Sequence, residues 1–181
     1  MNPTHLQPAQ VQHLTADLRR LLTAADTEFV PPLSARTGTL DQQLGPAKAS
    51  AAGVESYLAA LGQQSLLAAY DHARVIAFMS YRPGHVVQVA GHDPLGPLAY
   101  VTTVVVAPSA RRRGLARAMY ETLLAELDGG PVATRTWSGN TAHLNLLADL
   151  GFDEVIRLTD DRGPGVDTVY LARPGTRAPR A

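Results

Sequence analysis

The sequence predicts a single mixed α/β domain of about four helices, with one strand, helix, strand crossover in its second half. Two observations predict it. Segments with apolar residues at helical spacing alternate with runs rich in β-branched residues, in the order helix, helix, strand, strand, strand, helix, strand, helix, strand, strand. The length of 181 residues is also common for one domain. We expect residues 1–173 to form this domain and residues 174–181 to be a frayed tail.

The first half of the chain is predicted to hold two helices and a strand pair. Residues 8–25 place apolar side chains at helical intervals, and residues 50–62 form a second helix that ends at Gly62. Between them, residues 26–45 contain Pro31 and Pro32 and are read as a long ordered loop. Two short β-type runs follow, residues 64–71 and 73–83, joined by a hairpin turn.

The second half begins with a polar stretch, residues 84–97, which we read as a loop. Residues 98–108 then form a strong central strand that Pro108 ends, and a helix runs from about Gly114 to Gly129. The remaining predicted elements are a strand at 131–137, a helix at 140–150, and strands at 152–159 and 166–173. We read the charged turn between the last two strands, which includes Arg162, as solvated, with contact to an acceptor or a second subunit as the alternative.

Composition excludes several classes of function. With 45% hydrophobic and 18% charged residues, a packed globular fold is expected. Sixteen basic and sixteen acidic side chains cancel, so the chain as a whole has no field that would attract nucleic acid or an anionic membrane. No apolar stretch approaches the roughly 20 residues that cross a bilayer, and the start lacks the pattern of a signal peptide, so we expect a cytoplasmic protein.

Cysteine is absent, which excludes disulfides, thiolate metal sites and a cysteine nucleophile. The six histidines show neither H-x-x-x-H nor H-E-x-x-H spacing, so no metal site is expected.

The most informative segment is the loop between the central strand and the next helix, "VVVAPSARRRGLARAMY". A tight loop entering a helix presents unpaired backbone N–H groups and a positive dipole end, and so predicts a phosphate site. Gly114 and Ala116 allow close approach of the backbone, and four arginines add charge: Arg111, Arg112, Arg113 and Arg117. The alternative is that the arginines only cover a solvated helix start. The spacing matches neither Walker A nor G-x-G-x-x-G, so neither ATP nor a dinucleotide is favoured.

This segment resembles the acyl-CoA-binding segment of the GCN5-related N-acetyltransferase (GNAT) family, which reads V-x-P followed by Q/R-x-x-G-x-G/A. The matching positions are Val106, Pro108, Arg111, Gly114 and Ala116. A second family motif, an Asn followed eleven residues later by Gly-Phe, is matched by Asn140, Gly151 and Phe152. The resemblance covers residues 100–152. It implies a mixed, mostly antiparallel sheet of about six to seven strands with a βαβ crossover and splayed central strands, flanked by about four helices.

The resemblance also implies an acetyl-CoA site in the gap between the splayed strands, here residues 101–107 and 131–137. The CoA pyrophosphate would be held by backbone amides of Arg112, Arg113, Gly114, Leu115, Ala116 and Arg117. The pantetheine arm would pair with the strand edge formed by Val104, Val105 and Val106, one of whose N–H groups would polarise the thioester carbonyl. Asn140 would contact the pantetheine or the sulfur end of the cofactor.

The implied activity is transfer of an acetyl group from acetyl-CoA to a primary amine. Because no cysteine can form an acyl-enzyme, direct transfer in a ternary complex is the simpler mechanism. The acceptor remains open between a small-molecule amine and a protein N-terminus, and a homodimer is also left open. The alternatives are a non-catalytic acyl-CoA-binding sensor or scaffold, and an unrelated phosphate-binding α/β protein.

Two catalytic groups, the acid and the general base, are not settled by the resemblance. Many family members carry a Tyr seven residues after the motif Asn to protonate the departing thiolate, but this chain has Leu147 there. His143 lies one helical turn earlier, and either works as acid, base or substrate-side hydrogen-bond partner, or only packs. The candidate general bases are Glu28, Asp26, Glu55, Tyr100, Asp93 and Ser138. We single out Glu28 because its segment often walls the acceptor site in the family; Trp137 is either another wall or core.

Overall fold

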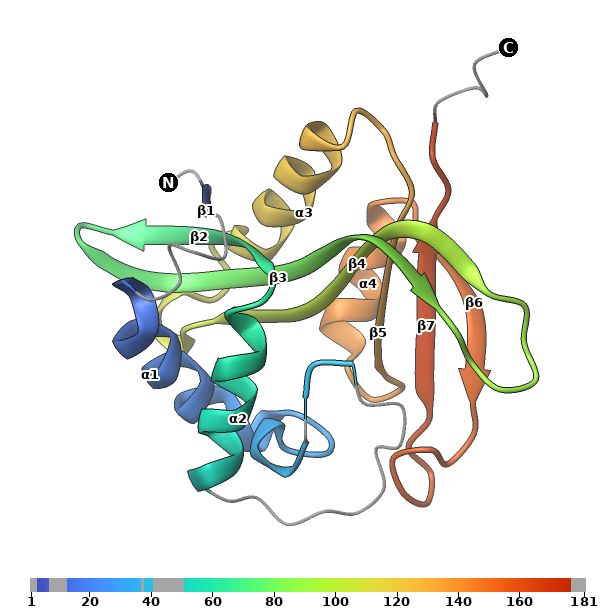
Figure 1. Ribbon diagram of the computed structural model, residues 1–181, viewed down its shortest axis with the longest axis horizontal. Helices are drawn as coiled ribbons and strands as arrows, with labels where there is room; N and C mark the ends of the chain where they lie inside the picture. The colour runs from blue at the N-terminus through green and yellow to red at the C-terminus, as the bar shows by residue number, and fades with distance from the viewer. Residues whose placement is uncertain (1–2, 7–12, 37, 41–50, 177–181) are drawn as a thin grey trace.

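The computed structural model describes residues 3–6, 13–36, 38–40 and 51–176 (Figure 1). Helices and strands follow in the order β1 Pro3–Leu6, α1 Thr15–Ala25, α2 Ala51–Leu61, β2 Ser65–Asp71, β3 Arg74–Val87, β4 Leu95–Val106, α3 Leu115–Glu126, β5 Val132–Trp137, α4 Thr141–Asp149, β6 Asp153–Leu158 and β7 Thr168–Arg173. The strands form one seven-stranded sheet in the order β1-β2-β3-β4-β5-β7-β6. The predicted mixed α/β fold with a βαβ crossover is confirmed, because β4 and β5 pair in parallel across α3 while the other pairs are antiparallel.

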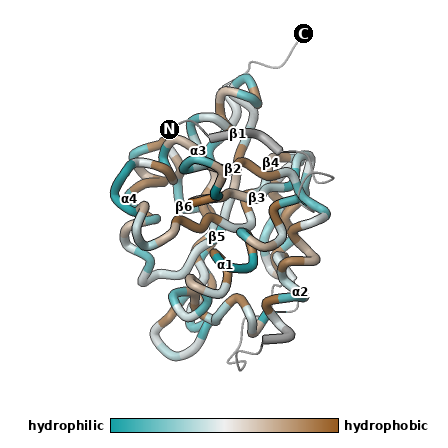
Figure 2. The backbone as a smooth tube through the Cα atoms, turned by 90° about the vertical axis from the view of Figure 1, so that its left-hand side faces the viewer, coloured by the Kyte–Doolittle hydropathy of each residue, from teal (hydrophilic) through white to brown (hydrophobic). Residues whose placement is uncertain are grey.

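Helices cover both faces of the sheet. In Figure 1, α1 and α2 lie together on one side of the long β3 and β4 ribbons, and α3 lies on the other. Each helix alternates between hydrophilic and hydrophobic segments in Figure 2, as expected of a helix with one face on a core. The largest buried side chains come from both layers and from the sheet between them, and include Leu18, Tyr57, Phe78 and Tyr120. The sheet thus holds α1 and α3 at fixed positions on opposite sides of β4.

The central strands separate partway along their length. β4 and β5 pair only at Ala99, Tyr100 and Val101, opposite residues 132–134. Beyond that point β4 continues against β3 as far as Val106, while β5 continues against β7. The hydroxyl of Thr134 donates to the Val101 carbonyl at 3.0 Å where the pairing ends. The described strands therefore diverge into a wedge at the centre of the sheet, as the splayed-strand prediction requires.

The structure differs from the sequence predictions in two places, namely at the start of the chain and between β3 and β4. The short strand β1, which pairs with β2, was not expected. The helix predicted over residues 8–25 is present as α1 from Thr15, and residues 8–12 of the prediction lie outside the described ranges. The expected loop over residues 84–97 is reduced to residues 88–94, because β3 extends to Val87 and β4 begins at Leu95. Bulges in the β3–β4 ladder accommodate Pro83 and Gly84, which interrupt a regular strand, so pairing resumes at His85.

The other element predictions hold within a few residues, since helix ends vary by one or two residues between definitions. The loop after α1 contains two short 3-10 helices, Asp26–Glu28 and Leu33–Ala35, and its residues 41–45 lie outside the described ranges. The carboxylate of Asp26 accepts hydrogen bonds from the Ser34 backbone N–H and hydroxyl, both at 2.7 Å. Near the other end of the chain, the Thr176 N–H donates to the Gly129 carbonyl at 2.7 Å, and residues 177–181 are not described.

Candidate active site

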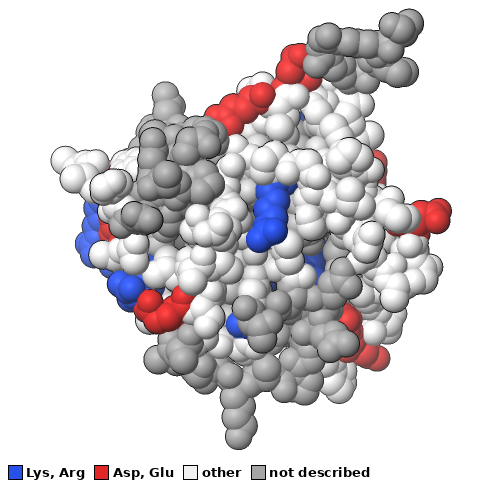
Figure 3. Space-filling model, viewed as in Figure 1, with Lys and Arg blue, Asp and Glu red and all other residues white. Residues whose placement is uncertain are grey.

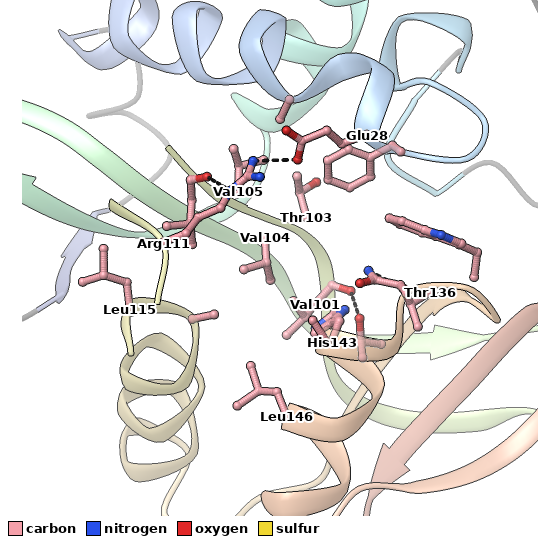
Figure 4. A pocket seen from close by; sticks show the side chains of 18 of the residues that line it. Glu28, Val101, Thr103, Val104, Val105, Arg111, Leu115, Thr136, His143 and Leu146 are labelled. Atoms are coloured by element: carbon pink, nitrogen blue, oxygen red, sulfur yellow. Dashed lines mark hydrogen bonds and ion pairs between the residues drawn. The ribbon is translucent and has the colours of Figure 1, made fainter. Parts of the chain in front are cut away.

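A cavity of about 600 Å³ occupies the wedge between β4 and β5. Its walls come from the loop after α1, from both diverging strands, from the start of α3, from α4 and from the β6–β7 loop. Figure 4 shows α1 on one side of β4, with α3 and α4 on the other, and side chains from all of these elements around one space. The cavity therefore joins the two motifs that the sequence singled out, at the point where the sheet opens.

The start of α3 forms an anion seat at one end of the cavity. The first hydrogen bond within the helix runs from the Ala118 N–H to the Gly114 carbonyl, so the N–H groups of the residues between them have no acceptor in their own helix. No side chain of the described residues caps this end. Gly114 has φ of 75°, and a Cβ built there would meet nothing within 4 Å. The residues that carry these amides, Leu115, Ala116 and Arg117, line the cavity, so this helix start can accept an anion.

Arg112 also has a left-handed backbone, with φ of 59°. This conformation is unfavourable for a side chain with a Cβ, and strain of this kind gathers at ligand-binding loops. Together with Gly114 it curves the loop around the helix start.

The other arginine side chains of the loop are engaged locally. Arg111 Nη2 lies 2.6 Å from Glu28 Oε2, and its Nε donates to the Val106 carbonyl at 3.2 Å. Arg113 donates to the Ser109 carbonyl at 3.0 Å, and Arg117 forms a 2.6 Å ion pair with an aspartate of α4. These exposed contacts brace the loop against β4 and the neighbouring elements. Over the described residues of the face in Figure 3, side chains of both charges are scattered over a mostly uncharged surface.

The exposed edge of β4 lines the middle of the cavity. Val104, Val105 and Val106 lie beyond the last residue pair with β5, so the β5-facing side of this edge has no partner among the described strands. Thr103 is buried on the strand, where its hydroxyl lies 2.7 Å from that of Tyr57 on α2. This contact ties the exposed edge to the helical layer.

Asn140 lies between β5 and α4 and also lines the cavity. Its side-chain Nδ2 donates to the Thr136 hydroxyl at 3.0 Å. Its backbone carbonyl accepts hydrogen bonds from the His143 and Leu144 N–H groups in the first turn of α4. The motif asparagine therefore joins the diverging strand to the helix and keeps its amide at the cavity wall.

His143 lines the cavity, whereas Leu147, one turn later, is fully buried in the core. The His143 Nε2 lies 3.0 Å from the hydroxyl of Tyr120 on α3. Burial lowers the pKa of His143 to about 4, so the imidazole is neutral at pH 7. Burial also raises the pKa of Tyr120, which keeps the phenol protonated. The pair is a neutral hydrogen-bonded link between two helices.

Of the six candidate general bases, Glu28 is the one that lines the cavity. It lies at the far side of β4 from α4, where it pairs with Arg111 (Figure 4). The others are engaged or lie elsewhere: Asp26 binds Ser34, Glu55 pairs with Arg19, Tyr100 is buried, Asp93 is in the exposed β3–β4 loop, and the Ser138 hydroxyl accepts the Asp167 N–H. Trp137 lines the cavity beside Phe29, with ring centroids 5.7 Å apart.

Three arginines of the cavity wall were not singled out as site residues from the sequence, although contact to an acceptor was left open for the turn that holds Arg162. Arg36, Arg135 and Arg162 all line it. Arg162 is only 6% exposed, so the expected solvated turn is wrong at this residue, although Asp160 and Gly165 in the same turn are exposed. The one local signal was a basic residue within the buried strand "PVATRTW". The positions of the other two could be found only from the tertiary structure.

The described residues contain no group of three or more His, Asp or Glu side chains placed to hold a metal ion. No helix among them is long and apolar enough to span a membrane.

Comparison with known proteins agrees with this geometry. A model of the acetyltransferase (GNAT) family matches residues 34–152. Among curated proteins, no sequence matches the chain.

Solved structures share the fold at low sequence identity. Aminoglycoside 6'-acetyltransferase type Ii is 16% identical with a TM-score of 0.65, over 99% of this chain and 100% of that one. NAA60 of Arabidopsis thaliana, in complex with a bisubstrate analogue, is 18% identical with a TM-score of 0.58, over 87% and 91%. The ribosomal-protein-alanine N-acetyltransferase of Brucella melitensis is 18% identical with a TM-score of 0.54, over 96% and 99%. At sequence identities this low, the structural similarity shows a common fold and nothing more.

Proposed function

The chain belongs to the acetyltransferase (GNAT) family, and from this premise we propose that it transfers the acetyl group of acetyl-CoA to a primary amine by direct transfer in a ternary complex. The observation that carries the proposal is the continuity of one cavity. The uncapped amides of α3, the exposed edge of β4 and Glu28 on the far side of that strand all border the same space. Such a space can hold a donor and an acceptor together.

The residues present fit acetyl-CoA. The open space above Gly114 and the free amides that follow it suit a diphosphate, since both steric access and backbone donors are available there. We assign the amides of Arg112 to Arg117 to this role, and Asn140 to the pantetheine or sulfur end. Acetyl-CoA supplies an acetyl thioester, whose carbonyl is the group that must be attacked.

The edge of β4 carries the N–H groups that we assign to the thioester. An extended pantetheine arm pairs with Val104, Val105 and Val106 as an added strand would. An N–H of this edge then stabilises the negative charge that develops on the thioester oxygen. Losing one such donor typically slows acyl transfer about 100-fold to 1000-fold.

Glu28 is the proposed proton acceptor for the incoming amine. An alkyl amine with pKa near about 10.4 is mostly protonated at pH 7, so it must lose a proton before attack. Arg111 holds the Oε2 atom of Glu28 at 2.6 Å, which fixes the carboxylate at the cavity wall. The other oxygen, Oε1, is the one we assign to the amine.

For His143 we propose a hydrogen-bonding role rather than proton transfer. An imidazole with pKa of about 4 is neutral at pH 7, so it is not in the imidazolium form that would act as an acid, and it accepts a proton poorly. Its bond to Tyr120 instead fixes the ring at the cavity wall. Departure of the CoA thiolate then needs only water, because a thiol has pKa near about 8.5.

The acceptor can be a small molecule or a protein N-terminus, since the solved structures of this fold include proteins named for aminoglycosides and for ribosomal-protein alanine. The test is release of the CoA thiol across a panel of amines, together with calorimetric titration of acetyl-CoA. Binding with amine-dependent thiol release supports the proposal. Tight binding with no release for any amine would instead assign the chain as a non-catalytic acyl-CoA sensor or scaffold.

A further inference from the structure

We propose that Gln64, which lies between α2 and β2, is a positioning residue that determines which backbone N–H groups of β4 face the cofactor. It does so by holding a β-bulge at Thr102, at the point where β4 leaves β5. The inference rests on the proposed acetyl transfer. It narrows the thioester-binding edge of β4 from three residues to the N–H groups of Val104 and Val106.

β4 contains one residue more than β3 at this point of the ladder. Ser80 lies opposite Thr103, whereas the next residue of β3, Tyr81, lies opposite Val101. Thr102 is therefore an extra residue in the two-against-one pattern of a β-bulge. Val101 is also the last residue of β4 that pairs with β5. The bulge thus begins where the two central strands separate.

The directions of the side chains agree with the bulge. Successive side chains of a regular strand point to opposite faces of the sheet. Here the Thr103 hydroxyl contacts that of Tyr57 on α2, and the Thr102 hydroxyl contacts the side chain of Gln64. The same Gln64 side chain donates to the carbonyl of Ala60 on α2. Two neighbouring side chains of β4 therefore both point toward α2.

Before the bulge, the odd-numbered residues of β4 turn their backbone groups toward β5. The Ala99 N–H donates to the carbonyl of Pro131, immediately before β5, at 3.0 Å. The Val101 carbonyl accepts the hydroxyl of Thr134 on β5 at 3.0 Å. Alternate residues of a strand point their N–H and C=O groups to opposite sides. Without a bulge, the odd-numbered residues would therefore continue to face the gap.

After the bulge, the even-numbered residues face the gap instead. The Ala107 N–H donates to the carbonyl of Ile76 on β3 at 2.8 Å, so Val105, two residues earlier, also faces β3. The Val106 carbonyl accepts a hydrogen bond from the loop before α3 at 3.2 Å, on the other side of the strand. Val104 and Val106 therefore turn their N–H groups toward the gap, where both residues line the cavity.

A buried hydrogen-bond network holds the bulged residue. Gln64 is 1% exposed, and its Nε2 donates to the Thr39 hydroxyl at 2.5 Å and to the Ala60 carbonyl at 3.4 Å. Its Oε1 accepts the Thr102 hydroxyl at 2.5 Å, which is nearer to that hydroxyl than the Ser80 carbonyl at 3.3 Å. Because Thr102 has a single hydroxyl proton, the Ser80 hydroxyl donates to it across 2.7 Å. Both ends of the Gln64 amide are engaged, and they fix the orientation of Thr102.

Loss of these contacts would free the bulge to move along β4. A bulge that moves by one residue changes which N–H groups face the gap, so a thioester held from the start of α3 would lose its donor. Gln64 does not line the cavity, and it therefore acts through β4. The alternative is that the network only satisfies buried polar groups. Its loss would then lower stability and leave the N–H pattern of β4 unchanged.

Amide hydrogen exchange of the free protein, followed by NMR, tests the backbone pattern without cofactor. In the unmodified protein, the Val104 N–H should exchange at least about tenfold faster than that of Val105, which faces β3. This ratio should fall toward one in Gln64→Met, which keeps the length of the side chain, and in Thr102→Val, which loses the hydroxyl. Thr102→Ser keeps the hydroxyl and should restore the ratio.

Kinetics test the consequence for acetyl transfer. In Gln64→Met and Thr102→Val, kcat should fall by about tenfold or more, since loss of an oxyanion donor typically costs about 100-fold to 1000-fold. The Kd for CoA should change by less than about threefold, because the amides at the start of α3 are untouched. Thr122→Val is the control for a lost hydroxyl, since Thr122 donates to the Ala118 carbonyl within α3. Val169→Ala, at a fully buried site on β7, is the control for lost stability.

Three outcomes overturn the proposal: an exchange ratio that survives in both variants, a ratio that falls while kcat is unchanged, and a kcat loss no larger than that of Val169→Ala. If Gln64→Met does not fold, Ser80→Ala, which removes the other contact of Thr102, takes its place. Failure of the proposed function would look different, because the unmodified protein would release no thiol with any amine. The exchange ratio would still decide whether Gln64 holds the bulge.

Discussion

The hydroxyl of Tyr120 lies 3.0 Å from Nε2 of His143, so a buried phenol of α3 meets an imidazole of α4 beside the cavity. The two rings are tilted by 38° with centroids 5.8 Å apart. Leu147, which occupies the position of the usual family tyrosine, is fully buried one turn away. A phenol of α3 therefore contacts the imidazole of α4 that lines the cavity.

The lowered pKa of His143 gives a stability prediction. The unfolded chain takes up a proton near pKa 6.5 and the folded chain only near about 4, so protons favour the unfolded state in this window. The free energy of unfolding should fall as pH drops from about 6.5 to about 4, and this loss should shrink in His143→Gln. Urea unfolding of both proteins across the window measures the difference. Parallel pH curves for the two proteins would contradict the assignment.

Gly114→Ala tests the anion seat. A Cβ at φ of 75° costs about 1 kcal/mol of stability and points into the space assigned to the diphosphate, so the Kd for acetyl-CoA should rise by about tenfold or more. Gly91→Ala is a matched control, because Gly91 has φ of 80° and equally open surroundings in the β3–β4 loop. Calorimetric titration of both variants decides the point. Equal affinities in the two would remove Gly114 from the cofactor site.

Asp26→Ala tests how the acceptor wall is held. The Asp26 carboxylate makes two 2.7 Å hydrogen bonds to Ser34, which close the loop that carries Glu28 and Arg36. Their loss should lower stability by about 1–3 kcal/mol and raise the KM for the acceptor, while the Kd for acetyl-CoA stays unchanged. Asp153→Ala, at an exposed site on β6, should change neither constant. A loss confined to acetyl-CoA binding would show that the loop serves the other end of the cavity.

Glu28→Gln separates proton transfer from loop bracing. Removal of a general base should lower kcat/KM by about 100-fold at pH 7. The free energy of unfolding should fall by less than about 1 kcal/mol, because the Glu28 and Arg111 side chains of the ion pair are 45% and 41% exposed, respectively. Glu121→Gln, an exposed site on α3, is the control. If kcat/KM is unchanged in Glu28→Gln, the residue only positions Arg111.

The features that could be predicted from the sequence are those that depend on residues close together along the chain. Gly114 and the loop before it could be found because an anion site at a helix start depends only on residues that are close in sequence. The predicted start of this helix agrees with the structure within a residue or two. The extent of β3 and β4 was missed because Pro83 and Gly84 normally end a strand, and only cross-strand bulges retain them. β1 was missed because four residues carry little periodicity and gain their order from pairing with β2.

Side-chain partners were the least predictable part of the site. Glu28 and Arg111 were both singled out, but their ion pair joins positions 83 residues apart. Arg36, Arg135 and Arg162 meet only because the sheet and two loops converge. His143 was proposed for its place one turn from Leu147, whereas its neutral state follows from burial, which a single sequence does not reveal.

The most direct test of the central claim follows a labelled acetyl group from acetyl-CoA. We predict that the label appears on the amine in equal amount to the released CoA thiol, and that the protein itself acquires no label when amine is withheld. Label that accumulates on the protein without amine would contradict direct transfer. Acetyl-CoA that binds but gives no labelled amine with any acceptor would contradict the assignment as an acetyltransferase acting on an amine.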